Sequence, residues 1–162
     1  MSTLASAGGR LGSSRKTAGA LVDSKMDVKT KLAILWVALV LCYAYADIIS
    51  FFQPGIVTEL ETGEVAGIEM TQGFLLSMSV LMSVPILMAV LSLLLKAKVN
   101  RLVNVIVGVF HACVLATTIL VPADTWAYYA YFMTVEAVLI GLIVWHAWKW
   151  PREGPARETV SS

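Results

Sequence analysis

Four long apolar stretches, separated by short polar segments, dominate the chain. The first, from Leu32 to Phe52, carries a single charge, Asp47, well inside it. About 20 residues of α-helix span the roughly 30 Å hydrocarbon core of a bilayer, and each stretch has about that length. We therefore predict an all-α, four-transmembrane-helix bundle. Its spans are expected at residues 32–52, 73–95, 102–121 and 127–148.

Proline and polar residues delimit these spans. Pro122 closes the third span, because proline lacks the amide hydrogen that continues a helix, and Pro85 should kink the second. Ser, Gly and Ala with scattered Lys and Arg, without apolar periodicity, indicate a disordered N-terminal tail. The beginning of this tail contains no acidic residue, which is also typical of a targeting peptide, so a targeting peptide is the alternative. The predicted domains are a basic tail (1–31), a membrane domain (32–150) and a short C-terminal tail (151–162).

Positive and negative charges are segregated along the chain. All 12 Lys and Arg residues lie in the N-terminal tail, in the link at 96–101, or after Trp148. Because cytoplasmic segments of membrane proteins are enriched in Lys and Arg, we predict both termini in the cytoplasm. The membrane would be the bacterial cytoplasmic membrane, with an organelle inner membrane as the alternative. The predicted outer loop, 53–71, contains only acidic charges, at Glu59, Glu61, Glu64 and Glu69.

The outer loop also contains apolar residues between its polar ones. A short hairpin or an interfacial helix would both fit this pattern, with a turn at Glu61–Glu64.

Composition agrees with a membrane protein. The chain is 58% hydrophobic and 14% charged, whereas soluble domains are about 25% charged. Nucleic-acid binding is not expected, because no folded basic domain is present to offer a positive surface. Cys42 and Cys113 both lie in apolar stretches and imply no disulfide framework.

Three ionisable residues lie within the apolar stretches: Asp47, His111 and Glu136. A charged side chain at the centre of a membrane helix costs about 2.5–3.5 kcal/mol on insertion scales, so it normally faces inward and has a partner. Counted from the predicted cytoplasmic ends of their helices, they lie about 22 Å, about 14 Å and about 18 Å deep. The three side chains can therefore form one layer.

Helical phase favours the same layer. Steps of three and four residues place Tyr43 and Ser50 on the face of Asp47, and Asn104 on the face of His111. Gly108 lies on that second face and would let a neighbouring helix approach closely. The candidate ligand- or proton-handling residues are Asp47, Glu136, His111 and Tyr43, supported by Gln72, Asn104 and Ser50.

Two classes of function remain open. Hydrogen bonds in membrane proteins contribute only about 0.6 kcal/mol on average, which is small beside the insertion cost of these groups. This comparison favours small-molecule or proton-linked binding or transport, for which a homo-oligomer would enclose more volume. The alternative is a structural or accessory subunit of a membrane complex. In that case Asp47 would bond Tyr43, His111 would bond Glu136, and the layer would only fix helix packing.

Cofactor, metal and catalytic motifs find little support. His146 lies about 10 Å from the level of His111, too far for a shared haem, and Cys113 faces away from His111 on its helix. No zinc spacing, catalytic triad order or phosphate-binding loop occurs. We expect no cofactor and no metal, and the pattern argues against an enzyme without excluding one.

Several short motifs carry a family resemblance. They are Tyr45-Ala46-Asp47-Ile48 before Gln53-Pro54-Gly55, Gln72, Pro85-Ile86, Val99-Asn100-Arg101 with Asn104, Glu136, and Trp145-His146-Ala147-Trp148-Lys149-Trp150. Across residues 31–150 the chain resembles an uncharacterised family of small four-span bacterial membrane proteins. The resemblance implies the four-span fold and no activity.

Overall fold

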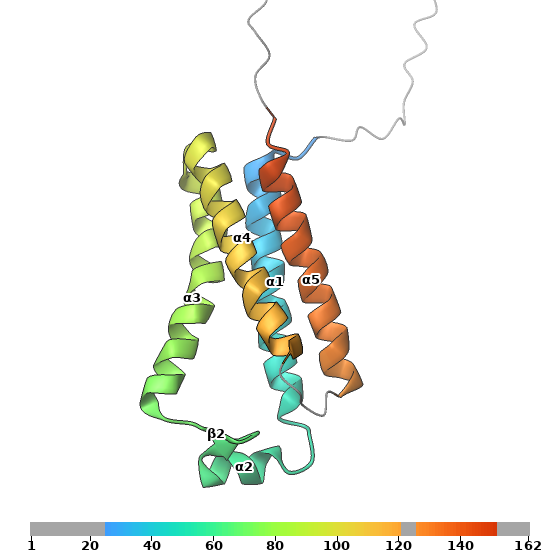
Figure 1. Cartoon of the computed structure of the whole chain (residues 1–162). Helices are drawn as coiled ribbons and strands as arrows, with labels where there is room; N and C mark the ends of the chain where they lie inside the picture. The colour runs from blue at the N-terminus through green and yellow to red at the C-terminus, as the bar shows by residue number, and fades with distance from the viewer. Residues whose placement is uncertain (1–24, 121–125, 152–162) are drawn as a thin grey trace, which may run out of the picture.

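The computed structural model describes residues 25–120 and 126–151. These contain four long helices, which lie side by side in Figure 1. These are α1 (Val28–Ser50), α3 (Gln72–Leu94), α4 (Ala97–Leu120) and α5 (Ala127–Trp148). Each is long and apolar enough to cross a bilayer, so the predicted all-α architecture with four membrane helices is confirmed for the described residues. The protein is a multi-pass integral membrane protein. Of the predicted tails, 1–31 and 151–162, residues 1–24 and 152–162 lie outside the described residues.

The first membrane helix begins four residues earlier than its apolar stretch. Asp27 caps it, with carboxylate oxygens that accept hydrogen bonds from the Lys29 amide at 2.8 Å and the Thr30 hydroxyl at 2.7 Å. These bonds satisfy groups that otherwise lack partners at a helix start. The basic residues Lys29 and Lys31, predicted to lie in the tail, therefore belong to the first turn of α1.

The order of packing around the bundle is α1, α3, α4 and α5. Helix α1 packs on α3 and α5, α4 packs on α5, and α3 contacts α4 less extensively. Helices α1 and α4 thus lie diagonally opposite, and their side chains meet in the centre. Both ends of the described chain emerge at one end of the bundle, here called the terminal end (Figure 1). The opposite end is the loop end.

The loop end carries the segment between α1 and α3. It contains both elements that its sequence allowed, a helix α2 (Ile56–Thr62) and a hairpin of β1 (Glu64–Val65) and β2 (Ile68–Glu69). The expected turn at Glu61–Glu64 is the end of α2, where Gly63 has φ +78°. The hairpin instead turns at Ala66 and Gly67, both with positive φ, as tight two-residue turns require.

The apolar core is concentrated toward the terminal end. Buried side chains there include Leu32, Trp36 and Met88, and α3 contributes buried residues only from Pro85 onward. Large apolar side chains cover the outside of the bundle, as expected for a surface in contact with lipid. The packing is therefore tight in the terminal half, and the loop half leaves room for a cavity between helices.

Gly108 sets how closely α4 approaches α5. A Cβ atom built at this position would lie 2.7 Å from Val144 Cγ2, so no larger residue fits without movement. Small residues permit such close approach between membrane helices. The approach is three residues from His111 and helps hold α4, with its polar face, against α5.

Candidate functional site

The Tyr43 hydroxyl joins the two ionisable side chains of the bundle centre. It lies 3.2 Å from His111 Nδ1 and donates to Glu136 Oε1 at 2.9 Å. The three residues come from α1, α4 and α5, so the arrangement exists only when these helices are packed together. We call Tyr43, His111 and Glu136 the central triad.

Two proton arrangements fit the same heavy-atom positions in the central triad. In one, an imidazolium Nδ1–H donates to Tyr43, and the Tyr43 O–H donates to an ionised Glu136. In the other, a protonated Glu136 donates to Tyr43, and the Tyr43 O–H donates to Nδ1 of a neutral His111. Each arrangement holds the same number of protons. The exchange moves the Nδ1 proton to Tyr43 while the Tyr43 proton moves to Glu136.

The other ring nitrogen of His111 is the open end of this chain of bonds. His111 is only 1% exposed, and its Nε2 atom is buried without a hydrogen-bond partner among the described residues. Trp36 and Phe110 contact the ring edge-to-face, at centroid distances of 5.8 Å and 5.5 Å. A buried polar atom without a partner is uncommon in a folded protein and calls for a specific explanation.

A second polar cluster lies toward the terminal end. The Trp36 indole N–H donates to Asn104 Oδ1 at 2.7 Å, and the Ser92 hydroxyl donates to the same oxygen at 3.2 Å. Asn104 in turn donates to the side-chain and backbone oxygens of Asn100, and Asn100 donates to the Ser92 carbonyl. All four side chains are buried. Because its donors and acceptors pair with each other, this cluster is suited to holding helices together.

Asp47 lies apart from the central triad. Its side chain is exposed near the loop end of α1, and it forms no hydrogen bond with Tyr43. Ser50 is half-buried and donates its hydroxyl to the Asp47 carbonyl at 2.6 Å. Both residues line a cavity of about 770 Å³ at the loop end. The structure thus brings Tyr43, His111 and Glu136 together and leaves Asp47 one helical turn away.

The remaining candidates divide between the two ends. Asn104 belongs to the second polar cluster, whereas Gln72 is exposed at the start of α3. The hydrogen-bond pairs expected for a purely structural layer, Asp47 with Tyr43 and His111 with Glu136, are replaced by the two bonds of Tyr43.

Sequence reasoning missed Ser92 and Asn100. Helix α3 is apolar on all sides near Ser92, so a lone serine gave no periodic signal. Asn100 precedes the predicted start of the third span at residue 102, but α4 begins at Ala97. Asn100 lies four residues before Asn104 and eight before Gly108, on the same face of α4 but outside the predicted span.

Metal-binding groups are not brought together in the part of the chain that the structure describes. No set of three or more His, Cys, Asp or Glu side chains has the spacing to hold an ion there. The central triad offers one imidazole and one carboxylate on opposite sides of a phenol. These three side chains can donate and accept hydrogen bonds, and each can carry a proton.

The chain matches one known protein family over most of its length. Residues 21–156 match a family of unknown function, DUF6326. The chain belongs to this family. The match includes all four long helices, so the family unit is the whole membrane bundle with the triad inside it. No curated protein and no solved structure matches the chain.

Proposed function

We propose that this protein handles protons within the membrane, through the central triad, as part of proton-linked binding or transport of a small molecule. His111 and Glu136 are the groups that accept and release the proton, and Tyr43 passes it between them. The observation that carries this proposal is the unpartnered Nε2 of His111 at the end of the hydrogen-bonded chain. A proton can enter or leave the triad at that atom without breaking the Tyr43 bonds.

Energetic comparison supports this proposal. An ionisable side chain in a membrane helix costs about 2.5–3.5 kcal/mol, whereas a membrane hydrogen bond contributes about 0.6 kcal/mol on average. The second polar cluster already bonds α1 to α3 and α4 with uncharged groups. The triad, which links α1 to α4 and α5 through an imidazole and a carboxylate, is by comparison an expensive way to hold helices together.

The proposed orientation places both termini in the cytoplasm and α2 with its hairpin outside. The described lysines and arginines lie at the terminal end, and the glutamates of the 53–71 segment lie at the loop end. The K/R bias of cytoplasmic segments supports this choice. A bacterial cytoplasmic membrane is the proposed location. A homo-oligomer is proposed for any transport cycle, because four helices enclose little space.

The second candidate is an accessory subunit of a membrane complex. The closed hydrogen bonding of Trp36, Asn104, Ser92 and Asn100 favours it, since such a cluster fixes helix packing and contains no charged side chain. Under this proposal the central triad would also serve only to fix helix packing. Replacing Tyr43 would then change stability without changing proton movement.

Proton flux in liposomes separates the two candidates. The full chain is reconstituted with a pH-sensitive dye inside, and a potassium diffusion potential drives proton entry. We expect flux above that of empty liposomes, and strong loss of it in Tyr43→Phe and Glu136→Gln. Tyr45→Phe is the matched control, because Tyr45 is exposed on the same helix and outside the triad. Equal flux in the wild type and in both triad variants would support the accessory role instead.

A further inference from the structure

The loop-end cavity is a site separate from the central triad. It has a volume of about 770 Å³ and is walled by α1, α4, α5 and the segment after α1. Small-molecule sites in proteins are typically concave spaces of about 300–1,000 Å³ with few polar groups. The cavity therefore has the size of a small organic ligand.

Asp47 supplies the cavity with its carboxylate. Ser50 bonds its backbone carbonyl, and no described residue forms a hydrogen bond or ion pair with the carboxylate oxygens. A carboxylate near hydrocarbon favours a positive partner, because its charge is poorly solvated there. The expected partner of the Asp47 carboxylate is a cation that can reach the cavity.

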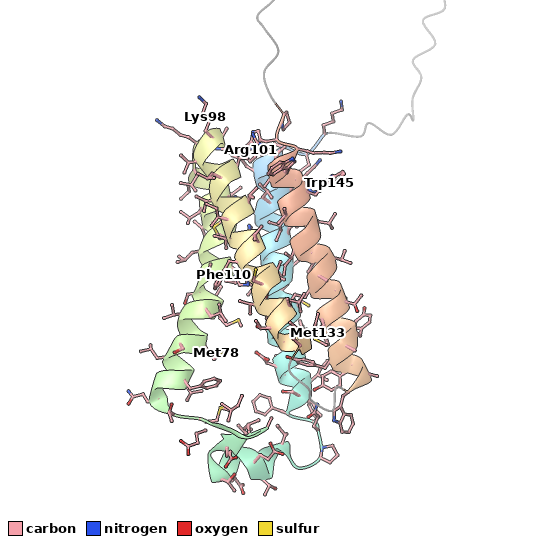
Figure 2. All side chains as sticks on the ribbon, in the orientation of Figure 1. Met78, Lys98, Arg101, Phe110, Met133 and Trp145 are labelled. Atoms are coloured by element: carbon pink, nitrogen blue, oxygen red, sulfur yellow. The ribbon has the colours of Figure 1, made fainter. Side chains whose placement is uncertain are left out.

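The chain's own described cations cannot reach Asp47. The described lysines and arginines lie before and in the first turn of α1, in the link after α3 and the first turns of α4, and just after α5. All of these positions are at the terminal end, where Figure 2 labels Lys98 and Arg101. Met133, which lines the cavity, lies toward the other end in the same view. No cation of the described residues pairs with Asp47, so its carboxylate is free to bind a positively charged molecule.

The other walls of the cavity select the kind of cation. Trp126, Tyr128 and Tyr129 line it together with Asp47. Aromatic rings attract ammonium groups through their electron-rich faces and contact the attached alkyl groups at the same time. Inorganic cations such as Ca²⁺ prefer several oxygen ligands, with carboxylates among them. This cavity offers one carboxylate, and the hydroxyls of Ser50, Thr117 and Thr118 that line it donate to backbone carbonyls of their own helices. A carboxylate with three aromatic side chains matches a substituted ammonium group.

We propose that the loop-end cavity binds a small organic cation, with its ammonium group against Asp47 and its alkyl groups against Trp126, Tyr128 and Tyr129. The inference does not rest on proton movement through the central triad. The ligand's chemistry is that of a substituted ammonium compound, either free in solution or as the headgroup of a lipid.

Binding of choline to the full chain tests this proposal. The protein is placed in nanodiscs of phosphatidylglycerol, which has no ammonium group, and radiolabelled choline is measured by equilibrium dialysis against empty nanodiscs. We expect saturable binding to the wild type and at least tenfold weaker binding to Asp47→Asn. The uncharged alcohol in which carbon replaces the choline nitrogen should compete at least tenfold less well than unlabelled choline.

Controls keep the result specific to the cavity. Glu61→Gln removes a carboxylate from the exposed face of α2, outside the cavity, and should bind choline as the wild type does. Tyr129→Leu should weaken binding even if Asp47→Asn proves poorly folded by circular dichroism. Repeating the measurement in phosphatidylcholine nanodiscs distinguishes a lipid headgroup from a free cation. Loss of choline binding there identifies the lipid headgroup as the occupant. Unchanged choline binding identifies a free cation. Absence of saturable binding in phosphatidylglycerol, equal competition by the uncharged alcohol, or unchanged affinity in Asp47→Asn and Tyr129→Leu would overturn the proposal.

Discussion

Trp36 and Asn104, 68 positions apart in the sequence, are joined by a 2.7 Å hydrogen bond from the indole N–H to the amide oxygen. The bond crosses the diagonal of the bundle, from α1 to α4, where the two helix backbones are not neighbours. Trp36 also contacts the His111 ring edge-to-face. One large side chain thus fills the bundle centre and connects the second polar cluster to the central triad.

A double-mutant cycle measures this bond. We expect Trp36→Phe and Asn104→Ala to show a coupling energy of about 0.6 kcal/mol, and up to about 1.7 kcal/mol, the range found for membrane hydrogen bonds. Unfolding in mixed micelles gives the four free energies. Trp36→Phe combined with Tyr45→Phe is the control and should show no coupling, because Tyr45 is exposed and distant. Coupling of equal size in both cycles would contradict a direct bond.

Substitution of Gly108 tests the close approach of α4 and α5. Gly108→Ala places a Cβ atom 2.7 Å from Val144 Cγ2, so we expect a loss of about 1–3 kcal/mol in the free energy of unfolding. Gly141→Ala is the matched control, since nothing lies within 4 Å of a Cβ there. It should be neutral or stabilising by up to about 1 kcal/mol, because alanine is the better helix former. Equal stability of the two variants would show that the helices are farther apart.

Nitrogen NMR of histidine tests whether the central triad behaves as a unit. The chain has two histidines, and His146 bonds the carbonyl of Leu142 within its own helix, which makes it an internal reference. We expect Glu136→Gln to shift the ring signals of His111, although Tyr43 separates the two side chains. Tyr43→Phe should shift His111 and abolish its response to Glu136→Gln. An unmoved His111 signal in Glu136→Gln would show that Tyr43 transmits nothing.

The start of α1 should depend on pH through Asp27. The Thr30 hydroxyl and the Lys29 amide bond its carboxylate and hold the pKa of Asp27 below its ordinary value. A depressed folded-state pKa means that the cap contributes fully above the ordinary value. This contribution is lost as the pH falls through the folded-state pKa. NMR should therefore show fraying of the first turn only in strongly acidic solution, and Asp27→Asn should remove that transition. A transition above the ordinary pKa of aspartate would reverse the sign and contradict the cap.

Sequence alone was sufficient for the membrane helices because their signal is long and uniform. A run of about 20 apolar residues has few alternatives in a folded protein. The helix ends were harder, since Val28 and Ala97 lie in charged segments that hydropathy excludes. The hydrogen bonds of Asp27 explain why α1 begins before the apolar stretch.

Depth and helical phase predicted which polar residues face the bundle interior, but they did not predict which side chains form hydrogen bonds with each other. His111 and Glu136 both contact Tyr43, which the phase argument had placed on an inward face. Asp47 shares that face, yet it is exposed, because the bundle is less tightly packed toward the loop end. Helical phase fixes the direction of a side chain, whereas the distance to the next helix depends on close contacts such as that of Gly108 with Val144.

The beginning of α1 and the residues just after α5 line a common pocket at the terminal end, to which Lys25, Lys29, Trp150 and Pro151 contribute. The link between α3 and α4 lies at this same end. Circular permutation should therefore be tolerated: a short linker would connect Pro151 to Lys25, and new termini would open between Leu95 and Ala97. Every helix would keep its neighbours and its direction across the membrane, with only the connectivity changed.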